Sequence, residues 1–296
     1  MTELRTFIQE KRPTLSDSSL TTYTSILKNL YHRVFSNTEA FDFTKFDESS
    51  KILEYLKDIP PNRRKVILSA LVVVSPQTKA YRDAMLNDIQ SYNEEIAKQE
   101  KTPQQEANWV QPDEIDTIWT TLKKNADLLY KKEKLNFNDL QQIQNFVLLS
   151  LLSGKFCPVR RSKDFVDFRI SNIDKTKHNY LDKNSLVFNS YKTVKTYGQQ
   201  RIPISIQLKN ILMKWIKHNP TEYLFFDTNN NPLSAVKINQ RLNKVFGNKK
   251  VSVNALRHSV LTSKFANTMK EMNEMKETMN QMGSSMLQAK TYVKNE

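Results

Sequence analysis

The sequence predicts a mainly helical protein that carries one small β-hairpin and divides into two domains. Apolar residues recur at spacings of three and four along most of the chain, and prolines or Ser/Asp-rich caps precede these stretches, which indicates helices. Short β-rich runs after residue 184 indicate the hairpin. With 296 residues, of which 39% are hydrophobic, the chain is long enough for two domains with their own cores.

The first hundred residues predict a helical domain. One helix is expected at 17–35, where a single face collects Leu20, Tyr23, Ile26, Leu27, Leu30, Tyr31 and Val34. Helices at 47–59 and 62–75 follow on either side of Pro60-Pro61, and another begins at Pro76. The polar stretch KQEKTPQQEAN at 98–108 then has no large apolar residue. We therefore expect a helical domain at 1–100, a linker at 101–108 and a second domain at 109–296.

The second domain is predicted to be mixed α+β. Helices are expected at 112–129 and 139–153, and after them the spacing of apolar residues is no longer helical. The runs SLVFNS (185–190) and QRIPI (200–204), joined by YKTVKTYG, predict the two strands of the hairpin. Helices resume at 205–218, 234–246, 253–266 and 269–282. Methionines in the last of these share one face, which predicts core packing or a surface for a neighbouring subunit.

Composition narrows the class of partner. A formal charge of +14 points to a polyanion such as nucleic acid. The single cysteine, Cys157, excludes a disulfide framework, and no Cys/His cluster has zinc spacing, so neither a metal nor a cofactor is expected. No run approaches the roughly 18 apolar residues of a membrane span, and the N-terminus lacks an apolar signal region. We expect an intracellular protein, in cytoplasm or nucleus, that does not enter a membrane.

Four stretches of the second domain hold polar residues in a particular chain order. SGKFCPVRRSKDFVDFRISNID holds an arginine with an acid three residues on, and YKTVKTYGQQRIPI places a lysine in the hairpin. VNALRHSVLTSKF supplies a second arginine, and MGSSMLQAKTYVKNE supplies a tyrosine. Over the C-terminal two thirds, these stretches resemble the tyrosine recombinase (phage-type integrase) family. The resemblance implies a catalytic domain there, and a helical, SAM-like domain that clamps DNA in the N-terminal third.

The resemblance assigns the first two catalytic residues. Counted back from the NID stretch, the family's first arginine falls on Arg161, with Asp164 in the place of its buried acid and Arg160 as the fallback. The family's Lys-Thr pair matches Lys192, and Lys195 is the alternative.

The resemblance also assigns the last two boxes, each with a departure. Where the family has HxLRH, this chain has Asn254 in place of the first histidine, followed by the matching Arg257 and His258. The final box ends on Tyr292 with one residue fewer than usual. Its His/Trp position falls on Ser284 by motif, or on Gly283 by count.

These residue types suit the transfer of a phosphodiester to a tyrosine. Two guanidinium groups can each hold two oxygens of the crowded, doubly charged transition state. A lysine can protonate the departing 5′ oxygen. A phenol has a pKa of about 10, and positive neighbours favour its ionised form. The family's product, a 3′-phosphotyrosine, stores the bond energy and requires neither ATP nor a metal.

The sequence therefore predicts a site-specific DNA recombinase or integrase that binds duplex DNA, on which the resemblance implies a homotetramer. The alternatives are a strand-nicking enzyme like a type IB topoisomerase and a non-enzymatic DNA-binding protein with a degenerate site. Arg63, Arg64 and Lys65, a basic run at a helix start, are predicted to contact DNA phosphates, as are Arg160 and Lys195. The YKTxKxYG and MGSS stretches are similar to sequences in integrases from mobile elements associated with large viruses.

Overall fold

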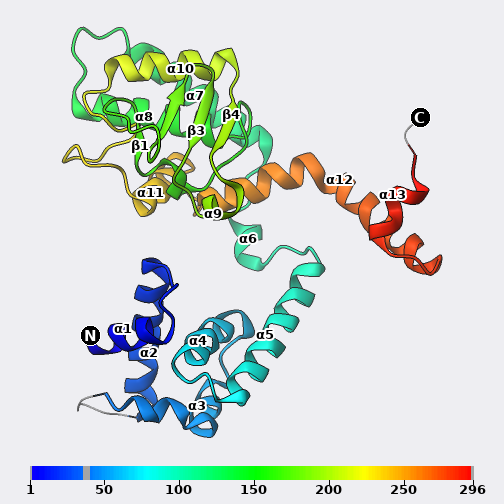
Figure 1. Cartoon of the computed structure of the whole chain (residues 1–296). Coiled ribbons are helices and arrows are strands. Elements are labelled where there is room, and N and C mark those ends of the chain that lie inside the picture. The colour runs from blue at the N-terminus through cyan, green and yellow to red at the C-terminus, as the bar shows by residue number, and fades with distance from the viewer. Residues whose placement is uncertain (1, 36–40, 295–296) are drawn as a thin grey trace. The chain divides into compact units, whose positions relative to one another are not determined.

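The computed structural model describes residues 2–35 and 41–294, and the chain divides into the units Met1–Glu100 (unit 1) and Lys101–Glu296 (unit 2) (Figure 1). Each unit buries an apolar cluster of its own. No helix in the described residues is both long and apolar enough to cross a membrane.

The described part of unit 1 is built from helices. They are α1 (Thr2–Lys11), α2 (Asp17–Phe35), the 3-10 turn η1 (Phe43–Asp47), α3 (Ser49–Leu56), α4 (Pro61–Val74) and α5 (Lys79–Ala97). The predicted helix at 17–35 has the bounds of α2. The sequence did not predict α1, which is short and buries Leu4 and Ile8, one helical turn apart. The residues predicted as a linker, 101–108, contain the short helix α6 (Pro103–Ala107), which Thr102 and Gln105 cap reciprocally.

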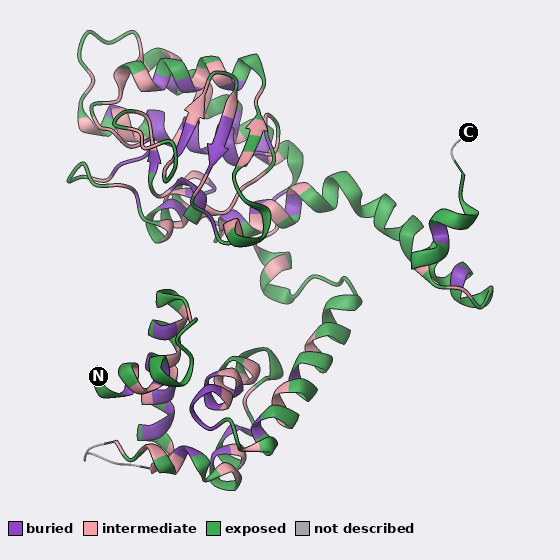
Figure 2. Ribbon diagram, viewed as in Figure 1, coloured by how far each residue is buried: buried purple, intermediate pink, exposed green. Residues whose placement is uncertain are grey.

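A small sheet and a buried helix form the centre of unit 2. The helices α7 (Pro112–Leu129) and α8 (Phe137–Leu152) precede the 3-10 turn η2 (Ser162–Phe165). The described residues then form a four-stranded sheet of order β1 (Phe168–Arg169), β2 (Asn179–Asp182), β3 (Ser185–Phe188) and β4 (Gln200–Pro203). Strands β1 and β2 are parallel and the other pairs antiparallel. Figure 2 shows that the buried residues of this unit gather on α8 and the central strands.

The predicted hairpin is β3 and β4, in which Leu186 faces Ile202. Its connection contains a short helix, α9 (Val194–Tyr197). The sequence did not predict β1 and β2, which are too short for alternation to show. Two further helices, α10 (Ile206–His218) and α11 (Ala235–Val245), lie close to their predicted bounds.

The last long helix, α12 (Val253–Gln281), extends away from the sheet of unit 2 (Figure 1). The sequence predicted two helices, at 253–266 and 269–282, but the junction residues Asn267 and Thr268 are neither glycine nor proline and do not interrupt the helix. Figure 2 shows α12 largely exposed. The expectation that its methionines form core is therefore wrong for most of them: Met269, Met272, Met275 and Met282 are exposed.

The chain folds back at the end of α12. The 3-10 turn η3 (Met286–Gln288) and the short helix α13 (Ala289–Tyr292) follow, and we call residues 283–292 the terminal hook. The backbone N–H of Ser284 donates to the carbonyl of Met279 at 2.8 Å. Met279 and Ala289 are buried. The last turn of α12 thus gains the packing partner that its middle lacks.

Candidate active site

The loop after α8 approaches α12 closely at a glycine. Gly154 has a φ of +73°, a left-handed conformation that glycine adopts without a steric penalty. A Cβ atom on this residue would lie 2.4 Å from Cγ1 of Val260 on α12. Because glycine has no Cβ, the loop can pass against α12 and carry Arg160 and Arg161 to the same place as Arg257.

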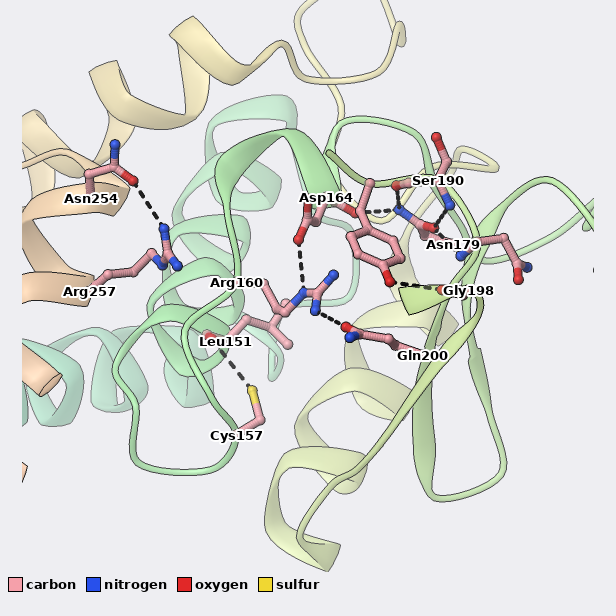
Figure 3. Close-up of polar contacts among 12 residues, drawn as sticks. Leu151, Cys157, Arg160, Asp164, Asn179, Ser190, Gly198, Gln200, Asn254 and Arg257 are labelled. Atoms are coloured by element: carbon pink, nitrogen blue, oxygen red, sulfur yellow. Dashed lines mark hydrogen bonds and ion pairs between the residues drawn. The ribbon is translucent and has the colours of Figure 1, made fainter. Parts of the chain in front are cut away.

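The side chain of Arg160 is held from several sides (Figure 3). Its Nε donates to Oδ2 of Asp164 at 2.8 Å, and Nη1 donates to Oε1 of Gln200 on β4. The guanidinium carbon lies 4.3 Å from the ring centroid of Phe188 and 4.8 Å from that of Tyr191. Its Nη2 is shielded and has no hydrogen-bond partner among the described residues.

Asp164 supplies the buried charge beside these arginines. The residue is 1% exposed, and burial raises the pKa of its carboxyl group while the charge of Arg160 opposes that rise. A buried carboxylate is costly unless paired, so Arg160 and Asp164 fix one another in position.

Asn179 ties the arginine loop to the sheet, a contact the sequence did not reveal. Its Nδ2 donates to the carbonyls of Asp164 at 2.8 Å and Ser190 at 2.7 Å, and its Oδ1 accepts from the backbone N–H groups of Asn189 and Ser190 (Figure 3). The residue is 3% exposed. An asparagine in a sequence ordinarily indicates a turn, so nothing in the local pattern distinguishes this buried connector.

Arg161 and Arg257 share a pocket with Arg160 and Asp164. The cavity has a volume of about 600 Å³. Its apolar wall includes Phe156, Val260, Leu261 and Phe265. Burial and the nearby positive charge of Arg161 lower the pKa of Arg257. The side chain of Arg161 makes no hydrogen bond within the described residues, so its donors are free for a ligand.

The two candidate lysines lie on the exposed connection between β3 and β4. Lys192 directly follows Tyr191, whose ring contacts Arg160 and whose hydroxyl donates to the carbonyl of Gly198 at 2.8 Å. The backbone of Lys192 therefore lies next to a residue that contacts the arginine cluster. Lys195 belongs to α9, three residues further along.

Asn254 and His258 are both exposed on the first turns of α12. Oδ1 of Asn254 lies 3.5 Å from Nη1 of Arg257, too long for a strong hydrogen bond (Figure 3). Both residues line a smaller hollow of about 220 Å³ that also includes Trp109 and Lys250. They adjoin the arginine pocket without lining it.

Tyr292 and Ser284 lie on the terminal hook, at the opposite end of α12 from the arginines (Figure 1). At about 1.5 Å per residue, roughly 36 Å of helix separates Arg257 from Gln281. Tyr292 is 57% exposed, and Oγ of Ser284 donates to Oε1 of Gln288 at 2.6 Å. The structure thus brings Arg160, Arg161, Arg257 and Asp164 together and leaves the tyrosine outside that group.

The basic run of unit 1 divides into residues with different environments. The guanidinium of Arg64 pairs with both carboxylate oxygens of Asp88 on α5, at 2.8 and 2.6 Å. Nζ of Lys65 lies 3.0 Å from the ring centroid of Tyr92. Arg63 is exposed. Arg64 therefore stabilises unit 1, and Arg63 has the environment expected of a phosphate contact.

No family model and no curated protein sequence matches the chain. Among solved structures it is similar to a lambda integrase dimer bound to a COC′ core site, at 14% identity over 87% of this chain and 68% of that chain, with a TM-score of 0.49. It is also similar to lambda integrase (residues 75–356) bound to DNA, at 14% identity over 90% of this chain and 89% of that one, with a TM-score of 0.47. XerA recombinase gives 13% identity over 90% and 84%, with a TM-score of 0.35. All three TM-scores lie below 0.5.

Proposed function

We propose that the chain is a site-specific DNA recombinase that cleaves and rejoins duplex DNA through a 3′-phosphotyrosyl intermediate. The observation that carries this proposal is the gathering of Arg160, Arg161 and Arg257 around one pocket beside the buried Asp164. Like charges repel, so such a cluster is costly unless it binds an anion. In a chain with a net charge of +14, a nucleic-acid phosphate is the anion that fits best.

The three arginines have different roles in this proposal. Arg161 and Arg257 hold the non-bridging oxygens of the scissile phosphate, because both residues line the pocket and planar guanidinium groups match the geometry of a phosphate. Arg160 is a positioning residue, since its Nε and Nη1 already donate to Asp164 and Gln200 and its Nη2 is shielded. Preorganised donors of this kind stabilise the charge that develops in the transition state.

The phenol oxygen of Tyr292 attacks phosphorus, forms the new P–O bond and gives its proton to solvent. The 5′ oxygen leaves and takes a proton from Lys192, with Lys195 as the alternative donor. Attack by a 5′ hydroxyl reverses these transfers and returns the proton to the lysine. The number of phosphodiester-type bonds is unchanged, so rejoining requires no ATP.

Tyr292 has to reach the arginine cluster for this chemistry. If the tyrosine comes from the same chain, α12 would have to bend or unfold locally. Asn267 and Thr268 are the most suitable place, because both have modest helix propensity. Otherwise the hook of a second copy supplies the tyrosine, in keeping with the proposed homotetramer on DNA. A mixture of Arg257→Ala and Tyr292→Phe chains distinguishes these two possibilities. The first chain keeps the tyrosine and the second keeps the arginines, so the mixture forms covalent adducts only if a second copy supplies the tyrosine.

We propose Arg63 as a unit 1 phosphate contact, and Arg64 and Lys65 as weaker ones because each already has a partner. Asn254, His258 and Ser284 are proposed as hydrogen-bond donors that join the site when DNA is bound. The similarity of the YKTxKxYG and MGSS stretches to integrases of large-virus-associated elements supports DNA integration by a mobile element, inside the host cell.

A pool of duplexes incubated with the protein in EDTA, without ATP, tests the proposal. We expect recombinant joints between pool members, at one preferred sequence, when the products are sequenced. Relaxation of supercoiled plasmid without such joints would instead favour a topoisomerase-like activity. DNA binding with neither product would show a non-enzymatic protein with a degenerate site.

A further inference from the structure

A second basic pocket lies between α8, α11 and the loop after Phe226. It has a volume of about 530 Å³, and the residues that line it are all different from those of the arginine pocket described above. Lys237, Arg241 and Lys244 contribute to it from α11. Their spacing of four and three places them on one helical face. This pocket therefore concentrates positive charge away from the candidate active site.

Arg241 is the unusual member of this pocket. Its Nη2 donates to the carbonyl of Phe226 at 3.1 Å, while Nη1 is shielded from solvent and has no partner among the described residues. Burial lowers the pKa of Arg241 to about 10, which still leaves the group charged at neutral pH. A positive charge is thus held in a poorly solvated place.

The nearest acid is already occupied. Oδ2 of Asp227 pairs with Nζ of Lys237 at 2.7 Å. Its Oδ1 accepts from the backbone N–H groups of Asn229 at 2.9 Å and Asn231 at 3.1 Å. Hydrogen bonds from Lys237 and these amides lower the pKa of Asp227, so its charge is committed to them. The charge of Asp227 opposes the effect of burial on the pKa of Arg241, but Asp227 forms its salt bridge with Lys237, and Arg241 has none within the described residues.

Polar groups on α8 complete the pocket without neutralising it. Asn145 lines it with an Oδ1 that is shielded and lacks a hydrogen-bond partner in the part of the chain described, and Gln141 lies one turn earlier. Gln240 and Asn243 add side-chain amides from α11. Amide groups both donate and accept hydrogen bonds, so they suit a ligand that carries hydroxyl or base edges beside its charge.

We propose that this pocket binds a phosphate group, with Arg241 as its central ligand and Lys244 at its rim. Guanidinium groups form strong charge-assisted hydrogen bonds with phosphate, and an anion in the pocket would give the charge of Arg241 a direct partner. Lys237 already holds Asp227 and is left as a supporting cation. The phosphate belongs either to a small phosphorylated molecule, such as a nucleotide, or to a DNA backbone that passes over α11.

Titration calorimetry of the full chain tests the small-molecule source, with inorganic phosphate and adenosine 5′-monophosphate as probes. The unmodified chain is expected to bind at least one of them, and both Arg241→Gln and Lys244→Gln to weaken that binding at least tenfold. Lys217→Gln is the matched control, since it removes the same charge from an exposed position on α10. It should leave the affinity unchanged.

The salt dependence of duplex binding tests the DNA source. Loss of one phosphate contact lowers the slope of log K against log[salt] by about 0.9. We expect this change in Arg241→Gln and Lys244→Gln, and not in Lys217→Gln, if the phosphate comes from DNA. Lys244→Gln decides the result if Arg241→Gln does not fold.

The phosphate site would be overturned if the unmodified chain binds neither probe and if the salt dependence of duplex binding has the same slope in the pocket variants as in the unmodified chain. Covalent adduct formation by the same variants is measured separately. It tests the proposed recombinase chemistry independently, because the pocket contributes no residue to that chemistry.

Discussion

Adjacent arginines in this chain have different environments, although the sequence presents them as an undifferentiated pair. Arg160 is pinned by Asp164, Gln200 and two aromatic rings, and its side chain is 14% exposed. Arg161 lines the same pocket without a side-chain hydrogen bond in the described structure. The motif count favoured Arg161 as the catalytic arginine, and we propose that Arg161 contacts the substrate while Arg160 has a positioning role.

Substitution of the two arginines should therefore have different consequences. Arg161→Ala is expected to lower the rate of DNA cleavage about a hundredfold, the scale for loss of a preorganised donor, with little change in melting temperature. Arg160→Ala is expected to destabilise the fold by about 3 kcal/mol, because it leaves Asp164 buried without its partner. Thermal melts and single-turnover cleavage measure the two effects. A normal melting temperature for Arg160→Ala would contradict the positioning role.

The lysine assignment can be tested through the leaving group. Lys192→Ala should slow cleavage far more than it weakens binding, because its proton goes to the departing oxygen. A substrate with sulfur at the bridging 5′ position should restore the rate, since a thiolate leaves without protonation. Lys195→Ala serves as the control. If that variant alone shows the defect and the rescue, the general acid is Lys195.

At the scale of elements, the sequence predicted best the helices that carry both apolar periodicity and proline or polar starts. The bounds of α2 and α7 agree with prediction for this reason. Strands β1 and β2 are too short to show alternation, and the continuity of α12 depends on the absence of a breaker rather than on a positive pattern. The arginines were found through a motif, whereas Asn179 and Gln200 depend on tertiary contacts that no local pattern specifies.

The approach of the α8 loop to α12 rests on Gly154, and substitution there should be costly. Gly154→Ala forces an alanine into a left-handed conformation and sets its Cβ against Val260. We expect a loss of unfolding free energy on the order of 2–3 kcal/mol. Gly247→Ala is the matched control, with a φ of +64° and open space around the added Cβ. Equal losses in the two variants, measured by denaturant titration, would show that contact with Val260 is unimportant.

At the scale of the whole molecule, the charge of +14 is the property that most constrains the partner. Phosphate contacts release counter-ions from DNA, so duplex affinity should fall steeply with salt, with a slope of about −0.9 per neutralised phosphate. Arg63→Gln should remove one phosphate contact, which makes the slope less steep by about 0.9. It should not reduce the stability of the protein. Arg64→Gln should chiefly destabilise unit 1, because it leaves the buried Asp88 unpaired. Fluorescence anisotropy over a salt series measures the slope, and a flat dependence would exclude the DNA assignment.

We propose that the arginine pocket and Tyr292 form one active site, even though the hook lies at the far end of α12. The most direct measurement is mass spectrometry of the protein–DNA adduct trapped on a nicked duplex that carries the preferred sequence. We expect a single phosphotyrosyl peptide that contains Tyr292. Tyr292→Phe should stay folded, bind DNA normally and give no adduct, and Arg257→Ala on its own should form adduct at least a hundredfold more slowly. An adduct on Tyr191 or Tyr197, or one that persists in Tyr292→Phe, would show that Tyr292 is not the nucleophile.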